Sequence, residues 1–341
     1  MSAPEQPPAN AAAPRKARGS ALGSSAPTRK ARDPLADRVA FAGVRLGVTL
    51  FRSLPAPAAR ALGRFLGRLA WRGSSRYRNQ VLRHMDLAFR DEIPRAQKEA
   101  WCKANFEHLG LFLVEFSRMS MLDPKSAAEL VDISEAQPLD ALLAKHKGVL
   151  FCPAHHGNWE LAGYSLSLLG YTLKSVARPL DHPQLNEMVM HLRELSGNTI
   201  IEKWQVLWKL KKILDGGGLV TMSVDQNGGV AGVFAPLFNT VASTVASPAE
   251  LHLFTGKPLV VATVNRLPDG IHHKFHIWDV IEHVKTGDHD ADRLAVITRI
   301  NRAYENAVRA YPEQWLWVHR RWKTRPPGEV PGPDGLPPCV T

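Results

Sequence analysis

The sequence predicts an α/β fold, in which a mixed sheet is flanked by helices. Beyond residue 148, short apolar runs typical of buried strands alternate with longer segments of helical spacing. The chain has 341 residues, 45% of them hydrophobic, which suits one large domain with extensions or two small ones. Three cysteines, without the spacing of a disulfide framework, favour a reducing compartment.

The positive charge of the chain is concentrated at its N-terminus. The net charge is +11, and residues 1–72 hold 13 basic and three acidic residues, a net +10. A basic arm on a nearly neutral body indicates an anionic partner, either a membrane surface or nucleic acid. Residues 1–34 are rich in Ala, Pro, Ser and basic side chains, so we expect a disordered basic tail and no secretory signal peptide.

Residues 35–72 are expected to form a helical, membrane-associating region that is broken near Pro55 and Pro57. An apolar stripe at helical spacing lies beside a row of arginines; the two sets are Leu62, Phe65, Leu66 and Leu69, and Arg60, Arg64, Arg68 and Arg72. This pattern suits a helix lying in an anionic lipid interface. The alternative is a solvated helix whose apolar face packs on the domain. The apolar window 39–51 is too short for a confident membrane span.

The rest of the chain is expected to form a catalytic domain, 73–326, and a Pro- and Gly-rich tail, 327–341. Its first part is expected to be helical, with breaks near 91–94 and 123–124. Strands are predicted at 148–154, 171–177, 218–224, 258–264 and 274–280, the last one nearer an edge. Helices are predicted at 157–169, 183–196 and 290–311.

The segment Ala154–Leu161 carries the chemistry that the sequence suggests. His155 and Glu160 follow the first predicted strand, at the strand ends where α/β folds place their ligand sites. On one continuous helix the two side chains would point about 140° apart. They can meet only if His155 sits in the turn before the helix and Glu160 lies in its first turns, which Gly157 and a capping Asn158 would allow.

A carboxylate beside an imidazole fixes its tautomer and makes it a general base that can deprotonate a hydroxyl. No G-x-S-x-G nucleophile elbow is present, so direct attack by an activated hydroxyl on a thioester is the simpler mechanism. His155 and His156 could instead hold a metal, although no H-E-x-x-H or H-x-x-E-H motif occurs. Otherwise His156 is a pocket wall or a surface residue.

The His-x-x-Asn-Trp-Glu motif after a Gly-Val-Leu strand resembles the first motif of the bacterial late lipid A acyltransferases, within the lysophospholipid acyltransferase superfamily. Further matching blocks follow in the same order: Ala177–Leu180 with Pro183, Asp225–Gln226, Gly232–Phe234, Pro236–Phe238, Gly256–Val260, Tyr311–Trp317 and His319–Pro326. The resemblance spans about residues 38–326. The chain departs from the family pattern at His156, a position that is often aromatic in the family, and at the glycine-rich stretch 227–231. These departures concern the identity of the acceptor.

This resemblance implies a glycerolipid-acyltransferase-like fold and a set of site residues. His155 would be the general base and Glu160 its partner. Arg178 would bind an acceptor phosphate or balance charge at the thioester, or form a structural ion pair with Glu160 or Asp225. Asp225 would orient Arg178. The remaining substrate contacts would come from Gln226 and Asn158.

The resemblance also implies the substrates and the location. The acyl donor would be acyl carrier protein or acyl-CoA, with no cofactor and no metal. The acceptor would be a lipid A precursor, or alternatively a lysophospholipid or another glycolipid. The protein would work on the cytoplasmic face of the bacterial inner membrane, peripherally or with one N-terminal anchor, without binding nucleic acid. The rival functions are a thioesterase, in which the base activates water, and a basic nucleic-acid-binding protein.

Overall fold

A seven-stranded mixed sheet forms the centre of the molecule. The computed structural model describes residues 34–339 except 204–205, 283–284 and 333–334. The strand order is β1-β9-β8-β2-β5-β3-β4, and all neighbouring pairs are parallel except β8 and β9. The strands are β1 (Val131–Asp132), β2 (Val149–Gly157), β3 (Leu173–Ala177), β4 (Thr199–Glu202), β5 (Leu219–Thr221), β8 (Leu259–Arg266) and β9 (His273–Ile281).

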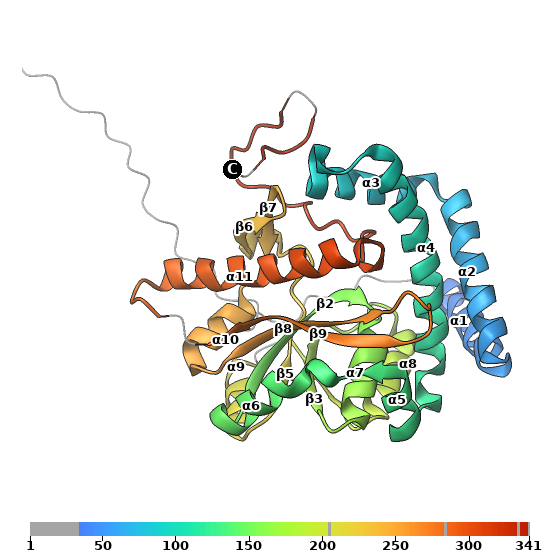
Figure 1. The fold of residues 1–341 in the computed structure, drawn as a ribbon, viewed down its shortest axis with the longest axis horizontal. Coiled ribbons are helices and arrows are strands. Elements are labelled where there is room, and N and C mark those ends of the chain that lie inside the picture. Colours follow the sequence, from blue (N-terminus) through green and yellow to red (C-terminus); the bar gives the residue numbers. More distant parts are fainter. Residues whose placement is uncertain (1–33, 204–205, 283–284, 333–334, 340–341) are drawn as a thin grey trace, which may run out of the picture.

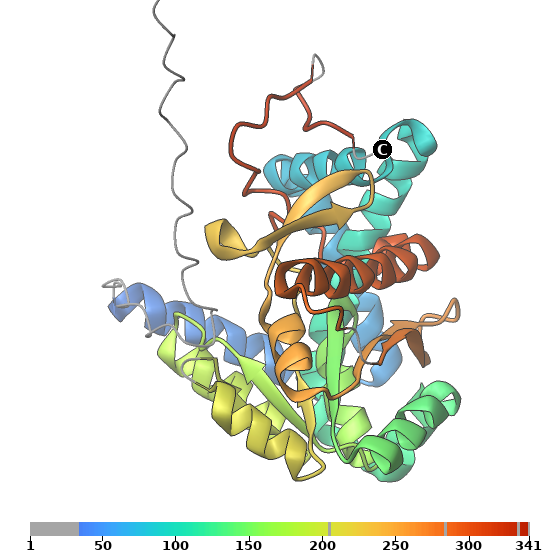
Figure 2. The ribbon, with the colours of Figure 1, turned by 90° about the vertical axis from the view of Figure 1, so that its left-hand side faces the viewer.

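Helices cover both faces of this sheet, and Figure 1 shows α11 on one side with α6 and α7 on the other. The helices are α1 (Pro34–Ser53), α2 (Ala56–Gly73), α3 (Ser75–Phe89), α4 (Arg95–Arg118), α5 (Pro124–Leu130), α6 (Gln137–His146), α7 (Trp159–Leu168), α8 (Pro183–Glu194), α9 (Leu207–Asp215), α10 (Ser247–Thr255) and α11 (His289–Ala310). A separate hairpin of β6 (Val233–Leu237) and β7 (Thr240–Thr244) lies across α11 from the sheet (Figure 2).

The central strand β2 is buried on both faces, which explains its continuous apolar run. Val149 and Phe151 belong to the core cluster shared with α6 and α7. Leu150 and Cys152 belong to the cluster shared with α9, α10 and α11. Cys152 is therefore a core residue, and its burial raises the pKa of its thiol.

The five predicted strands and the three predicted helices of the catalytic domain are present, with ends shifted by a few residues. The two predicted breaks separate α3 from α4 and α4 from α5, and β9 lies next to the edge strand β1. The hairpin was not predicted, because Pro236 interrupts its strand pattern and its turn places Phe238 at a φ of 53° without a glycine.

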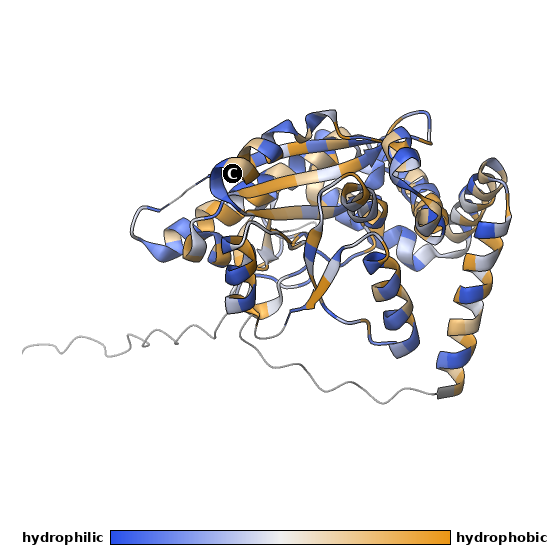
Figure 3. Ribbon diagram, turned by 90° about the horizontal axis from the view of Figure 1, so that it is seen from below, coloured by the Kyte–Doolittle hydropathy of each residue, from blue (hydrophilic) through white to orange (hydrophobic). Residues whose placement is uncertain are grey.

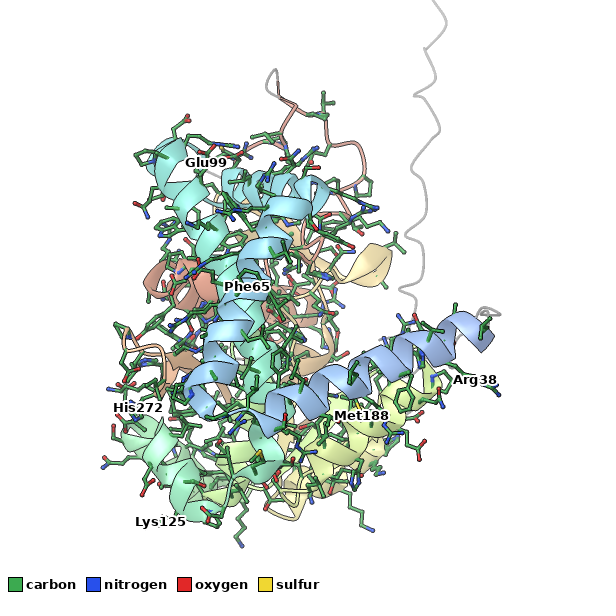
Figure 4. The ribbon with its side chains drawn as sticks, turned by 90° about the vertical axis from the view of Figure 1, so that its right-hand side faces the viewer. Arg38, Phe65, Glu99, Lys125, Met188 and His272 are labelled. Atoms are coloured by element: carbon green, nitrogen blue, oxygen red, sulfur yellow. The ribbon has the colours of Figure 1, made fainter. Side chains whose placement is uncertain are left out.

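The N-terminal helices α1 and α2 meet at Pro55, as predicted, and lie side by side with α4 and α8 (Figure 4). The apolar stripe of α2 packs on the domain only in part: Leu62 contacts a core cluster, whereas Phe65 is 57% and Leu69 55% exposed. Along α1, hydrophobic and hydrophilic residues alternate, whereas the central strands are mostly hydrophobic (Figure 3). Among the described residues, no helix has both the length and the apolar character that a membrane crossing needs. The predicted disordered tail, 1–34, lies outside the described residues except for its last position.

Glycines make the contact between α2 and α4 close. A Cβ on Gly110 of α4 would collide with the backbone of Gly63, and a Cβ on Gly67 would collide with the backbone of Phe106. The two helix backbones touch because these positions carry no side chain. The face of α2 opposite its exposed stripe is thus fixed to the body of the protein.

A substitution of Gly110 tests this contact. We expect Gly110→Ala to lower the free energy of unfolding by about 1–3 kcal/mol, because the added methyl group meets rigid backbone. Gly47→Ala is the matched control, since a Cβ there meets nothing within 4 Å and alanine favours helix by up to about 1 kcal/mol. Urea unfolding of both variants measures the difference. Equal stabilities would mean that the α2–α4 contact is not close-packed in solution.

Candidate active site

A sharp turn joins β2 to α7 and presents the histidine motif. Gly157 has a φ of +64°, and a Cβ there would collide with the backbone of Val264 on β8. The Oδ1 of Asn158 accepts from the backbone N of Leu161 at 3.1 Å and so caps α7. The turn at Gly157 and the cap at Asn158 agree with the prediction from the sequence, whereas His155 lies on β2 itself and not in the turn after it.

His155 is held by Asp225, which follows β5. The Nδ1–H of His155 donates to Oδ1 of Asp225 at 2.6 Å, and the backbone N–H of His155 donates to Oδ2 at 2.7 Å. The indole Nε1–H of Trp315 donates to the same Oδ2 at 2.9 Å. With Nδ1 engaged by a carboxylate, the Nε2 of the neutral ring carries the lone pair, and the Gln226 amide lies 3.4 Å from it.

This pairing shifts both pKa values. Burial would lower the pKa of His155, but the charge and the hydrogen bond of Asp225 outweigh it and raise the pKa above its ordinary value. Burial would likewise raise the pKa of Asp225, but His155 outweighs it and lowers the pKa to about 2. The carboxylate is therefore ionised, and the histidine is a stronger base than a free imidazole.

The expectation that Glu160 is the hydrogen-bond partner of His155 is wrong. Both oxygens of Glu160 are taken by the guanidinium of Arg193 on α8, at 2.6 and 2.8 Å. His155 lies on β2 and Glu160 on the first turn of α7. The carboxylate beside Nδ1 of His155 is therefore that of Asp225, which follows β5. Glu160 still raises the pKa of His155 through its charge, as a smaller contribution than that of Asp225.

The expected substrate contact of Asn158 and the expected partners of Arg178 are corrected as well. The Oδ1 of Asn158 caps α7 and its Nδ2 donates to Glu115 at 2.7 Å, and the residue is fully buried, so its side chain is not accessible to a substrate. Asp225 does not orient Arg178. Instead Arg178 is half exposed and pairs with Asp181 at 2.8 Å, rather than with either predicted acid.

A cavity of about 750 Å³ opens beside His155. Its polar lining includes residues from distant parts of the chain: His155, Glu160, Arg178, Arg193, Gln226 and His319. Its apolar lining includes Tyr164, Leu166, Leu173, Val176 and Ile200. Such a cavity combines polar groups for chemistry with apolar surface that favours a hydrocarbon chain, by about 0.8 kcal/mol per buried CH₂.

His156 is not a surface residue. It is fully buried, its Nδ1 lies 2.6 Å from the amide of Asn265, and its Nε2 lies 3.0 Å from the backbone oxygen of Tyr311. Burial lowers its pKa to about 4, so the ring is neutral. Within the described part of the chain, no three His, Cys, Asp or Glu side chains are grouped to hold a metal ion.

The sequence did not identify Arg193, His319 or Trp315 as site residues. Arg193 lies within a predicted helix, and only its distance to Glu160 gives it a role. Trp315 belonged to a recognised sequence block; it is buried, and its indole N–H donates to the carboxylate of Asp225. His319 belonged to a recognised sequence block without an assigned function.

The sheet, the carboxylate-held histidine at the end of a central strand and the adjoining half-apolar cavity together define an α/β enzyme that handles a substrate with an apolar part. The chain belongs to the bacterial lipid A biosynthesis acyltransferase family, whose family model matches residues 29–324. It is an acyltransferase.

The chain is similar to several named acyltransferases. The lipid A biosynthesis lauroyltransferase of Escherichia coli is 27% identical over 277 residues, covering 81% of this chain and 88% of the relative. The lipid A biosynthesis palmitoleoyltransferase of the same organism is 27% identical over 288 residues, covering 83% and 91%. The phosphatidylinositol mannoside acyltransferase of Mycobacterium tuberculosis is 22% identical over 235 residues, covering 67% and 72%.

The basicity of His155 provides a test of the pairing. We expect Asp225→Asn to lower the pKa of His155, because the charge that stabilises its protonated form is removed. Glu160→Gln should lower it less, since Glu160 contributes less. NMR titration of ring-labelled histidine, with His155→Ala to assign the signal, measures both. A larger shift in Glu160→Gln would contradict the assignment of Asp225 as the partner.

Proposed function

We propose that this acyltransferase moves a fatty acyl chain from acyl carrier protein, or from acyl-CoA, to a hydroxyl of a lipid A precursor. The observation that carries the proposal is the buried His155–Asp225 pair, with Nε2 in a half-apolar cavity, in a chain of this family. The elevated basicity of His155 suits the removal of a proton from a hydroxyl, whose own pKa is far higher.

The reaction proceeds by direct transfer. The Nε2 of His155 takes the proton of the acceptor hydroxyl while its oxygen attacks the carbonyl carbon of the thioester. The tetrahedral intermediate collapses as the C–S bond breaks, and the thiolate takes the proton back from Nε2. Asp225 keeps Nδ1–H in place and stabilises the imidazolium that exists between the two transfers.

Charged side chains at the cavity would place the acceptor. Arg193 is tied to Glu160 by two hydrogen bonds, so this pair forms a rigid wall on α7 and α8. Arg178 also lines the cavity, and its half-exposed guanidinium makes only a surface ion pair with Asp181. A phosphate of the acceptor would readily compete with such a pair, which contributes at most about 1 kcal/mol.

A different glycolipid is the alternative acceptor. One relative is named a phosphatidylinositol mannoside acyltransferase, so acceptors differ within the group of relatives. The stretch 227–231 follows Gln226 directly at the cavity and includes the short helix Gly229–Ala231, so it is placed to influence which acceptor is accommodated.

The enzyme would reach its acceptor from the surface of the bacterial inner membrane, on the cytoplasmic face. Phe65 and Leu69 on α2, and Val39 and Leu46 on α1, are exposed by 55–71% and lie on helices of one side of the molecule (Figure 4). Arginines on the same helices would attract anionic lipid by about 1 kcal/mol each. The same positive charge would attract an acidic carrier protein.

An acyl-transfer assay with mass-spectrometric readout tests the reaction. Acyl carrier protein thioesters, acyl-CoA, lipid A precursors, lysophospholipids and phosphatidylinositol mannosides serve as substrates. We expect one added acyl group on a lipid A precursor, and a fall of about 10²–10⁴-fold in kcat for His155→Ala. The matched control is His272→Ala, because His272 is exposed and pairs only with Asp269 in a surface turn.

The outcomes separate the candidate functions. Equal kcat for His155→Ala and the unaltered protein would overturn the general-base mechanism. Acylation of another lipid, without acylation of a lipid A precursor, would show that the proposed acceptor is wrong. Free fatty acid without acylated lipid would identify a thioesterase, and salt-sensitive DNA binding without lipid binding would favour the nucleic-acid function.

Vesicle flotation tests the membrane contact. We expect the double variant Phe65→Glu, Leu69→Glu to bind anionic vesicles at least about tenfold more weakly, since burying each side chain stabilises by about 1.5–3 kcal/mol. Leu294→Glu on α11 is the control, because it changes another exposed leucine, 42% exposed, on a different helix. Equal losses in both variants would refute a specific role of α2.

A further inference from the structure

The segment after α11 is built into the active site. The backbone N of Leu316 donates to the backbone oxygen of His155 at 3.0 Å, and Trp315 bonds Asp225. Three residues further on, His319 lines the same cavity as His155 and Gln226. The proposed mechanism above gives His319 no role.

The hydrogen bond of His319 fixes the position of its proton. The backbone N–H of Asn227 donates to the Nε2 of His319 at 2.9 Å. A backbone N–H can only donate, so this Nε2 carries a lone pair, and the proton of the neutral ring is on Nδ1. Burial, together with the positive charge of nearby groups, lowers the pKa of His319 to about 4, so the ring stays neutral at physiological pH.

The Nδ1–H of His319 has no acceptor among the described residues, and it is not one of the fully enclosed polar atoms. The ring is thus held by one nitrogen, while the other nitrogen keeps a donor that is not fully enclosed, on a residue that lines the cavity. His319 cannot act as a second base, because the only lone pair of its neutral ring accepts the N–H of Asn227. A fixed neutral donor beside the base is suited to bind an oxygen on which negative charge develops.

We propose that His319 is a catalytic residue whose Nδ1–H donates to the acyl carbonyl oxygen as this becomes an oxyanion in the tetrahedral intermediate. The amide of Gln226, on the same wall and 3.4 Å from the Nε2 of His155, is the second donor. This inference rests on the proposed acyl transfer. Loss of one donor of this kind lowers kcat by about 10²–10³-fold in enzymes that use it.

Two substitutions separate catalysis from structure. In His319→Gln, the side-chain oxygen lies near the position of Nε2 and still accepts from Asn227, but the cavity donor is lost. In His319→Asn, the amide nitrogen lies near the position of Nδ1, but Asn227 loses its acceptor. We expect His319→Gln to keep its melting temperature and lose about 10²–10³-fold in kcat. His319→Asn should melt lower and retain more of its kcat than the Gln variant.

The reverse order of kcat would overturn the proposal, because a purely structural histidine is better replaced by glutamine. Slow hydrolysis of the acyl thioester without acceptor gives a second readout, since it passes through the same oxyanion. Hydrolysis should fall by the same factor in His319→Gln. Unchanged hydrolysis with slowed transfer would show that His319 binds the acceptor instead. Absence of both reactions in the unaltered protein would overturn the proposed function and this assignment together.

Discussion

The site depends on one buried carboxylate. Asp225 accepts three N–H groups, two from His155 and one from Trp315, and so joins the end of β2, the end of β5 and the segment after α11. An ionised carboxylate without these donors would be costly in such surroundings. With them, its charge raises the basicity of His155 and sets the tautomer of the ring. The same carboxylate therefore sets the pKa of His155 and holds the three backbone segments together.

The surroundings of the turn keep this arrangement in place. Gly157 lets β2 approach β8, and Asn158 links the start of α7 to Glu115 on α4. Glu115 in turn accepts two hydrogen bonds from the guanidinium of Arg266 at the end of β8. The removal of one partner from such a buried pair leaves an uncompensated charge and is strongly destabilising. The histidine is consequently positioned by a rigid scaffold that reaches into the N-terminal helical region.

Much of the fold followed from local patterns, whereas the partners in the site did not. The apolar run of β2, the turn at Gly157 and the cap at Asn158 each follow from neighbouring residues. The choice between Glu160 and Asp225 as the partner of His155 depends on strand order, which brings β5 beside β2. The short spacing along the chain favoured Glu160, which is nearer to His155 in the sequence. His319 and Arg193 were missed for the same reason, because their roles rest on contacts between distant segments.

The three segments that meet at Asp225 have a consequence for biosynthesis. They leave the ribosome in the order in which they are numbered, and the central strand with His155 precedes its tryptophan contact by 160 residues. A nascent chain whose N-terminal helices have already folded therefore lacks the Trp315 contact to Asp225 until the segment after α11 has emerged. The hydrogen bonds that hold His155 and Asp225 are therefore complete only after the segment that follows α11 has been synthesised.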